Sequence, residues 1–291
     1  MIAALTKRHM QVFFRDKGAV FFSLLSPLII FLLFFLFLGA SQLTSLKDSL
    51  PHVDDDKLSL FLNSWVYAGI VMTTTITTGL AALGVFVADR ESRRFTDFAV
   101  SPVPRWKVVM SYLLATASIA AIITTIVYLA AQIYLITQGA PVPTFEVLIQ
   151  TVGRYLLIAF SFAALSSLVI TFIKSNAAFT SLSVIVGTGI GFMAGIYVPL
   201  GIMSASVANV LNALPFAQAA VLLREPFVTV PLERVGEGQP AQVVEQLAET
   251  YGLQAIIDGH VLSSSTIAVL LAAIGIVALT LATVQISRKL K

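Results

Sequence analysis

Residues 18–46 read GAVFFSLLSPLIIFLLFFLFLGASQLTSL, and none of these side chains carries a charge. A helix crosses the hydrocarbon core of a bilayer with about 20 apolar residues, so this stretch is long enough to span a membrane. The apolar core of a cleaved signal peptide has only about 7 to 15 residues, and Gly39-Ala40-Ser41 is a weak cleavage site. We therefore expect a first membrane span here and no cleaved leader.

The rest of the chain has the same apolar character. Of its 291 residues 57% are hydrophobic and 11% are charged, and the mean hydropathy is +0.92. Strands of a membrane barrel would alternate apolar and polar residues over about ten positions, whereas the apolar windows here are continuous. The sequence therefore predicts an all-α integral membrane protein, with residues 1–291 as a single transmembrane domain. Its six predicted transmembrane helices cover 19–40, 60–87, 108–136, 151–173, 177–200 and 263–286.

Charged residues divide the connecting segments into two sides. Eleven of the fifteen Asp and Glu lie on one side, and thirteen of the eighteen Lys and Arg lie on the other. Loops rich in Lys and Arg stay in the cytoplasm, so we expect both termini and the loop 88–107 to be cytoplasmic. The net charge of +3 then reflects orientation and predicts no nucleic-acid partner. These basic residues are Lys7, Arg8, Arg15, Lys17, Arg90, Arg93, Arg94, Arg105, Lys107, Lys174, Arg288, Lys289 and Lys291.

Two segments outside the spans carry their own patterns. Residues 1–18 predict an amphipathic helix at the cytoplasmic interface, in contact with membrane lipids; the alternative is a basic flank that only orients the first span. Residues 201–262 predict re-entrant or interfacial short helices followed by an external segment, because Pro215 breaks an uncharged run that ends at Leu223. From Pro240 an amphipathic external helix is expected.

Several classes of chemistry find no support in the sequence. None of the six windows places an ionisable residue near its centre, which weighs against an ion-coupled carrier. There is no G-x-x-x-x-G-K-[ST] loop for ATP, no H-E-x-x-H and no G-x-S-x-G, and no cysteine. His9, His52 and His260 are scattered and are expected to be ordinary polar positions. We therefore expect this chain not to be an enzyme and to bind no metal or cofactor itself.

Small, hydroxylated and aromatic residues recur within three of the predicted spans. Glycines at four-residue spacing let helices approach closely, and threonines can bond across helices. They are candidates for a translocation path or for dimer packing; the alternative is packing within one subunit, with the phenylalanines facing lipid. Ser26-Pro27 predicts a kink in the first span. The candidates are Phe31, Phe34, Phe35, Thr74, Thr77, Thr78, Gly187, Gly191 and Gly195.

The loop after the second span, VADRESRRFTDFAVSPVPRW at 87–106, is unusually charged. As a helix it places Arg90, Arg94 and Asp97 on one face and Glu91, Phe95 and Phe98 on another. Pro102 and Pro104 end it before the third span. Such a helix is suited to docking a soluble partner; the alternative is a solvated loop that only satisfies the orientation rule.

At this loop the sequence resembles the ABC-2 type transporter permeases, particularly their drug-efflux branch. That branch has a charged E-R-x-x-G-T segment leading into S-P-V-x-R, which here corresponds to the charged residues before Thr96 and to SPVPR at Ser101 to Arg105. The resemblance extends over the six-span plan and the L-P at Leu214-Pro215. It departs at Phe95, where the family usually has glycine.

The resemblance implies a permease that pairs with a separate cytoplasmic ATPase, which binds the ATP and Mg, usually as two permeases with two ATPases. The permease pair is expected to be a homodimer in a bacterial cytoplasmic membrane, with spans one, two and five lining the route. Its expected substrates are hydrophobic or amphipathic: a drug, a lipid or an antimicrobial peptide, exported from the cytoplasm or the inner leaflet. The coupling residues it implies are Arg90, Glu91, Arg94, Phe95, Thr96, Asp97 and Phe98, with Lys174 in a second contact.

Two other functions stay open on the sequence alone. The first is an ion-coupled secondary carrier or channel, which the lack of intramembrane charge disfavours. The second is a membrane scaffold or sensor whose external segment 201–262 binds one partner while the cytoplasmic loop recruits another.

Overall fold

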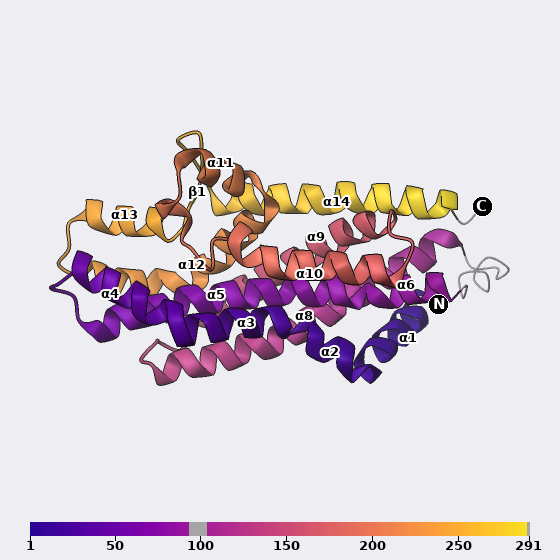
Figure 1. Cartoon of the computed structure of the whole chain (residues 1–291), viewed down its shortest axis with the longest axis horizontal. Coiled ribbons are helices and arrows are strands. Elements are labelled where there is room, and N and C mark those ends of the chain that lie inside the picture. The colour runs from indigo at the N-terminus through magenta and orange to yellow at the C-terminus, as the bar shows by residue number, and fades with distance from the viewer. Residues whose placement is uncertain (93–103, 290–291) are drawn as a thin grey trace.

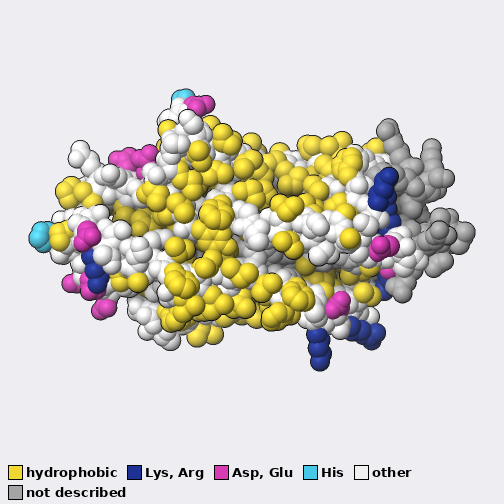
Figure 2. Space-filling model, in the orientation of Figure 1, with side chains coloured by type: hydrophobic (Ala, Val, Ile, Leu, Met, Phe, Trp, Pro, Cys, Tyr) yellow, Lys and Arg dark blue, Asp and Glu magenta, His cyan; other side chains and the backbone are white. Residues whose placement is uncertain are grey.

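The computed structural model describes residues 1–92 and 104–289, and in it the helices run side by side along one long axis (Figure 1). Helix α1 (Ile2–Arg15) and the C-terminal part of α14 (Ser264–Lys289) lie at one end, here called the terminal end. The opposite, distal end holds the end of α4, the start of α5 and α13 (Figure 1). On the face shown in Figure 2, hydrophobic side chains are most abundant in the middle and charged ones gather toward the two ends.

Among the described residues, six helices are long and apolar enough to cross a membrane. This confirms the predicted all-α membrane fold. Helix α10 ends at Met193, short of the predicted 200, because Gly195 adopts a left-handed φ of +62° and turns the chain. The spans are α2, α3, η1 and α4 together (Lys17–Ser23, Leu25–Leu33, Phe34–Leu38 and Gly39–Ser49), α5 with α6 (Asp55–Ala82 and Gly84–Glu91), α8 (Arg105–Thr137), α9 (Phe145–Ile170), α10 (Asn176–Met193) and α14.

The first span is interrupted at Leu24, as the Ser26-Pro27 pair predicts. Pro27 has no N–H to donate to the carbonyl of Ser23, four residues earlier. The Thr77 hydroxyl of α5 lies 3.0 Å from that carbonyl and 2.9 Å from the Thr73 carbonyl of its own helix, so its one proton is shared between the two. The break is therefore stabilised by the neighbouring helix, which fixes the first span against the second.

Helix α5 is the centre of the bundle and is buried over most of its length. Two of its buried threonines return their hydroxyls to the backbone: Thr74 donates to the Ile70 carbonyl at 2.7 Å and Thr75 to the Val71 carbonyl at 2.8 Å. The first and fifth spans, in contrast, expose most of their side chains. Those two spans form the apolar outer face on which a groove lies.

Between α10 and α14 the chain forms a distal cap. It starts with η2 (Leu200–Ile202) and α11 (Ala205–Ala213), and then bends by 84° into α12 (Pro215–Gly236), which confirms the break predicted at Pro215. Helix α12 lies along the distal half of α5 and continues through Pro226 and Pro231. The carbonyl of Leu222, which Pro226 cannot bond, accepts from Arg154 Nη1 at 3.0 Å.

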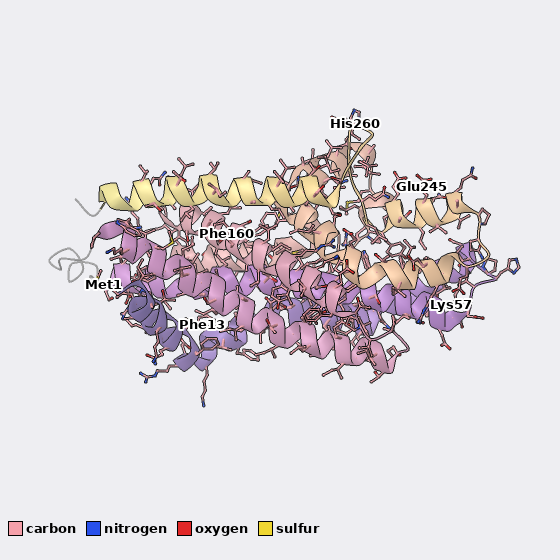
Figure 3. The ribbon with its side chains drawn as sticks, turned by 180° about the vertical axis from the view of Figure 1, so that it is seen from behind. Met1, Phe13, Lys57, Phe160, Glu245 and His260 are labelled. Carbon is pink, nitrogen blue, oxygen red and sulfur yellow. The ribbon has the colours of Figure 1, made fainter. Side chains whose placement is uncertain are left out.

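The remainder of the cap is partly exposed. Helix α13 (Ala241–Thr250) buries Leu247 and leaves Glu245 and Glu249 outside, as its amphipathic pattern predicts. A hairpin of β1 (Ala255–Ile257) and β2 (His260–Leu262) follows, joined by Asp258-Gly259 with φ of 50° and 79°. Glu245, His260 and Lys57 lie toward the distal end, away from Met1 and Phe13 (Figure 3).

Candidate coupling site and apolar groove

An ion pair fixes α1 to the base of the charged loop. Arg8 donates to Asp89 through its two terminal guanidinium nitrogens, with Nη1–Oδ2 at 2.7 Å and Nη2–Oδ1 at 3.1 Å. The Tyr112 hydroxyl of α8 donates to Oδ2 of the same carboxylate at 2.7 Å. The Asp89 side chain is only 3% exposed, so its charge is stable there because these partners compensate the lost hydration.

His9 completes this cluster and differs from the ordinary polar position expected of it. Its side chain is buried, its ring stacks on Tyr112 with centroids 3.7 Å apart, and Nε2 lies 3.2 Å from Ser111 Oγ. Burial, together with the nearby Arg8, lowers the pKa of His9 to about 4, so the ring is neutral at pH 7. Helix α1 thus turns Arg8 and His9 toward the bundle, where an interfacial helix was expected to turn Arg8 to water.

The same loop base contacts the turn between α9 and α10. Arg90 Nη1 donates to the Ile173 carbonyl at 2.8 Å, and the Asn176 side-chain amide donates to the Glu91 carboxylate. Thr171, at the end of α9, donates its hydroxyl to the Gln285 side chain of α14. The start of the charged loop therefore holds three other parts of the terminal end in one network: α1, the 171–176 turn and, through that turn, α14.

The structure describes only some of the predicted coupling residues. The structure brings Arg90 and Glu91 together with the turn that carries the exposed Lys174. Their contact with a partner stays a prediction. Arg94, Phe95, Thr96, Asp97 and Phe98 lie outside the described residues.

An apolar groove runs along the outer face between the first span and α10. Its wider part has a volume of about 860 Å³ and its part at the terminal end about 460 Å³. The two parts adjoin, because five residues line both of them. The groove's walls meet where Ser26 Oγ donates to the Gly187 carbonyl at 2.5 Å. The shared residues are Phe22, Ser26, Thr180, Ser183 and Gly187.

The nine candidates for a path or dimer contact do not line one surface of the described chain. Gly187 and Thr77 line the groove. A side chain at Gly191 would collide with the Tyr197 ring, 2.3 Å from its Cβ position, and Gly195 forms the turn after α10. Thr74 and Thr78 are buried within α5. Phe31, Phe34 and Phe35 line a separate depression of about 240 Å³ beside Tyr67 and Tyr134.

The comparison with known protein families identifies this arrangement. A model of the ABC-2 type transporter family matches residues 1–228, which hold five spans and most of α12. The chain belongs to this family. It is a multi-pass membrane subunit of an ABC transporter, whose ATPase is a separate chain. The search of curated proteins finds no significant match.

In this ABC-2 permease the distal cap contains a buried charge that the sequence reasoning missed. Arg224 of α12 is fully buried and donates to the carbonyls of Ala194 and Gly195 at 2.9 and 2.8 Å and of Gly252 at 2.9 Å. Its guanidinium also lies 5.1 Å from the Trp65 ring centroid. The signal in the sequence is a single arginine that ends a 49-residue uncharged run.

Glu225, the next residue of α12, links the permease cap to α9 and α14. Glu225 pairs with Arg154 of α9 at 3.1 Å and accepts a hydrogen bond from Ser264 at the start of α14. Arg224 and Glu225 are adjacent on α12, but Arg224 bonds to the turns that follow α10 and α13, whereas Glu225 bonds to α9 and to the start of α14. Together they connect the distal ends of α9, α10 and α14 to the cap.

Proposed function

We propose that this permease is the export subunit of an ABC transporter in a bacterial cytoplasmic membrane. In this proposal two copies form a homodimer and associate with two cytoplasmic ATPase subunits, which bind ATP and Mg²⁺. Both termini are cytoplasmic, so the terminal end described above faces the ATPase. The substrate is hydrophobic or amphipathic and leaves the cytoplasm or the inner leaflet.

The observation that carries the proposal is the pair of links from one loop base to both walls of the groove. Asp89 is bonded to Arg8 of α1, and α1 leads directly into α2, the first wall. Glu91 is bonded to Asn176, the first residue of α10, the second wall. A displacement of the loop by an ATPase would therefore move both walls.

This linkage supports a gating transition of the kind seen when helices shift between two packings. The loop segment 89–99 acts as the coupling helix, with Arg90, Glu91, Arg94, Phe95, Thr96, Asp97 and Phe98 as its contacts and Lys174 in the second contact. The groove is apolar along most of its length, which supports a substrate drawn from the membrane and not from water.

Transport by the reconstituted complex tests the proposal. The permease and its ATPase are placed in vesicles that carry a fluorescent amphiphile in the leaflet facing the ATPase, and loss of that dye is followed after ATP is added. ATP-dependent transfer away from the ATPase side is expected. ATP hydrolysis by an intact complex with no transfer of any amphiphile would contradict an export function.

A further inference from the structure

The part of the groove at the terminal end contains few hydrogen-bond donors. Its lining includes five hydroxyl side chains, and each donates its proton to a backbone carbonyl. The amide of Asn176, also in the lining, donates to Glu91. With their protons engaged in this way, the five hydroxyls are left as hydrogen-bond acceptors. An anionic or acceptor-rich ligand would find little to bind there. The five hydroxyls belong to Ser23, Ser26, Thr77, Thr180 and Ser183.

One carboxylate stands at the mouth of this part of the groove. Asp16 is the charged residue of the lining, and Oδ1 accepts from the Ala19 backbone N–H at 3.0 Å as the N-cap of α2. Among the described residues no Lys or Arg forms an ion pair with it, including its chain neighbours Arg15 and Lys17, which are exposed to solvent. Glu91 lies next to the same mouth through its bond to Asn176. In the wider part of the groove, beyond Ser26, none of the described lining residues is charged.

We propose that the groove binds amphipathic cations: the cationic group sits at Asp16, and the apolar body lies along α3 and α10. This inference rests on the proposed function and narrows its substrate class. A carboxylate beside hydrogen-bond acceptors attracts a cation and repels an anion. The wider part alone, at about 860 Å³, is as large as a drug-sized pocket, so an apolar body fits there.

A pair of isosteric probes isolates the charge. The first is a fluorescent dye with an apolar chain that ends in trimethylammonium, and the second carries tert-butyl in its place. Trimethylammonium keeps its charge at every pH. Binding is measured on the full-length permease in phosphatidylcholine nanodiscs, because these lipids carry no net charge. We expect the wild type to bind the cation about tenfold more tightly than the neutral probe.

The Asp16→Asn variant keeps the cap of α2, because asparagine is as good an N-cap as aspartate, but removes the charge. The preference for the cation should fall from about tenfold to less than about twofold. Asp16→Ser, which also caps, is the second variant should the first fold poorly. Asp48→Asn at the distal end of α4 is the matched control and should keep the wild-type preference.

Two outcomes separate this inference from the export proposal. If ATP-driven transfer of both probes occurs and Asp16→Asn leaves the preference for the cation unchanged, the cation site is wrong and export stands. If the preference depends on Asp16 but the complex transfers neither probe, the cation site stands and export fails. A wild type that binds both probes equally overturns the inference directly.

Discussion

Arg8 and Asp89 form a two-bond ion pair across 81 positions of sequence, and this pair links helix α1 directly to the loop base. Arg8→Ala would leave a nearly buried carboxylate with less compensation; the cost is about 3 kcal/mol, the lower end for a broken buried pair, because Arg8 is partly exposed. We expect a lower thermal midpoint of the purified permease and weaker stimulation of the ATPase by substrate. Arg15→Ala, an exposed change on the same helix, is the control. Unchanged stimulation in Arg8→Ala would show that α1 takes no part in coupling.

The buried His9 predicts a pH dependence of stability. Its pKa is lowered from 6.5 to about 4 in the folded chain, so between these values the unfolded chain binds more protons. The contribution of His9 is therefore complete above pH 6.5 and is lost as the pH falls toward 4, by up to about 3 kcal/mol. His9→Phe keeps a ring against Tyr112 but cannot titrate. Its thermal midpoint should fall less than that of the wild type between pH 7 and 4.5; parallel curves would refute the assignment.

The Ser23 carbonyl at the Pro27 break predicts that Pro27→Ala rescues the stability lost in Thr77→Val. Thr77→Val removes the hydroxyl that donates to it and leaves a buried acceptor unsatisfied, which costs about 1–3 kcal/mol. Adding Pro27→Ala restores a backbone N–H for that carbonyl, so the double variant should recover most of the loss. Thr74→Val, whose hydroxyl bonds only within its own helix, should cost less. Thermal unfolding of the four proteins measures the cycle, and strictly additive effects of Thr77→Val and Pro27→Ala would argue against the compensation.

Arg224 predicts a large and specific loss of stability. Arg224→Met removes donors from three buried carbonyls, and because bonds to charged groups contribute about 1.5–3 kcal/mol each, we expect a loss of at least about 3 kcal/mol. Arg224→Lys should recover only part of it, because a single ammonium cannot reproduce the planar fork. Arg234→Ala, which removes one exposed bond to Gly139, should cost less than about 1 kcal/mol. Equal costs for Arg224→Met and Arg234→Ala in chemical unfolding would contradict this role.

Hydropathy and charge were enough to predict the six spans, the broken segment at Pro215 and the amphipathic helix after Pro240. They could not predict the end of α10, because the turn depends on the backbone conformation of Gly195, and hydropathy carries no information about that conformation. They also gave no indication that α12 passes through Pro226, since the Arg154 side chain that compensates that proline comes from a distant helix.

The candidate site was predicted less completely than the fold. The loop base at Arg90 and Glu91 was identified because local charge density marks it. Its partners were missed: the rotation of α1 that buries His9 and pairs Arg8 with Asp89 depends on packing between helices far apart in sequence. The groove was missed for the same reason, since only Gly187 and Thr77 of the candidates line it.

Association with the ATPase tests the central claim most directly. The permease is co-expressed with an ABC ATPase and purified through a tag on the permease, and the ATPase retained is quantified. We expect near-complete loss with Phe95→Asp combined with Phe98→Asp, and with charge reversal at Arg90 and Arg94, while Asp48→Asn retains the partner. Full retention of the ATPase by all of these loop variants, at wild-type expression, would show that this loop is not the coupling element.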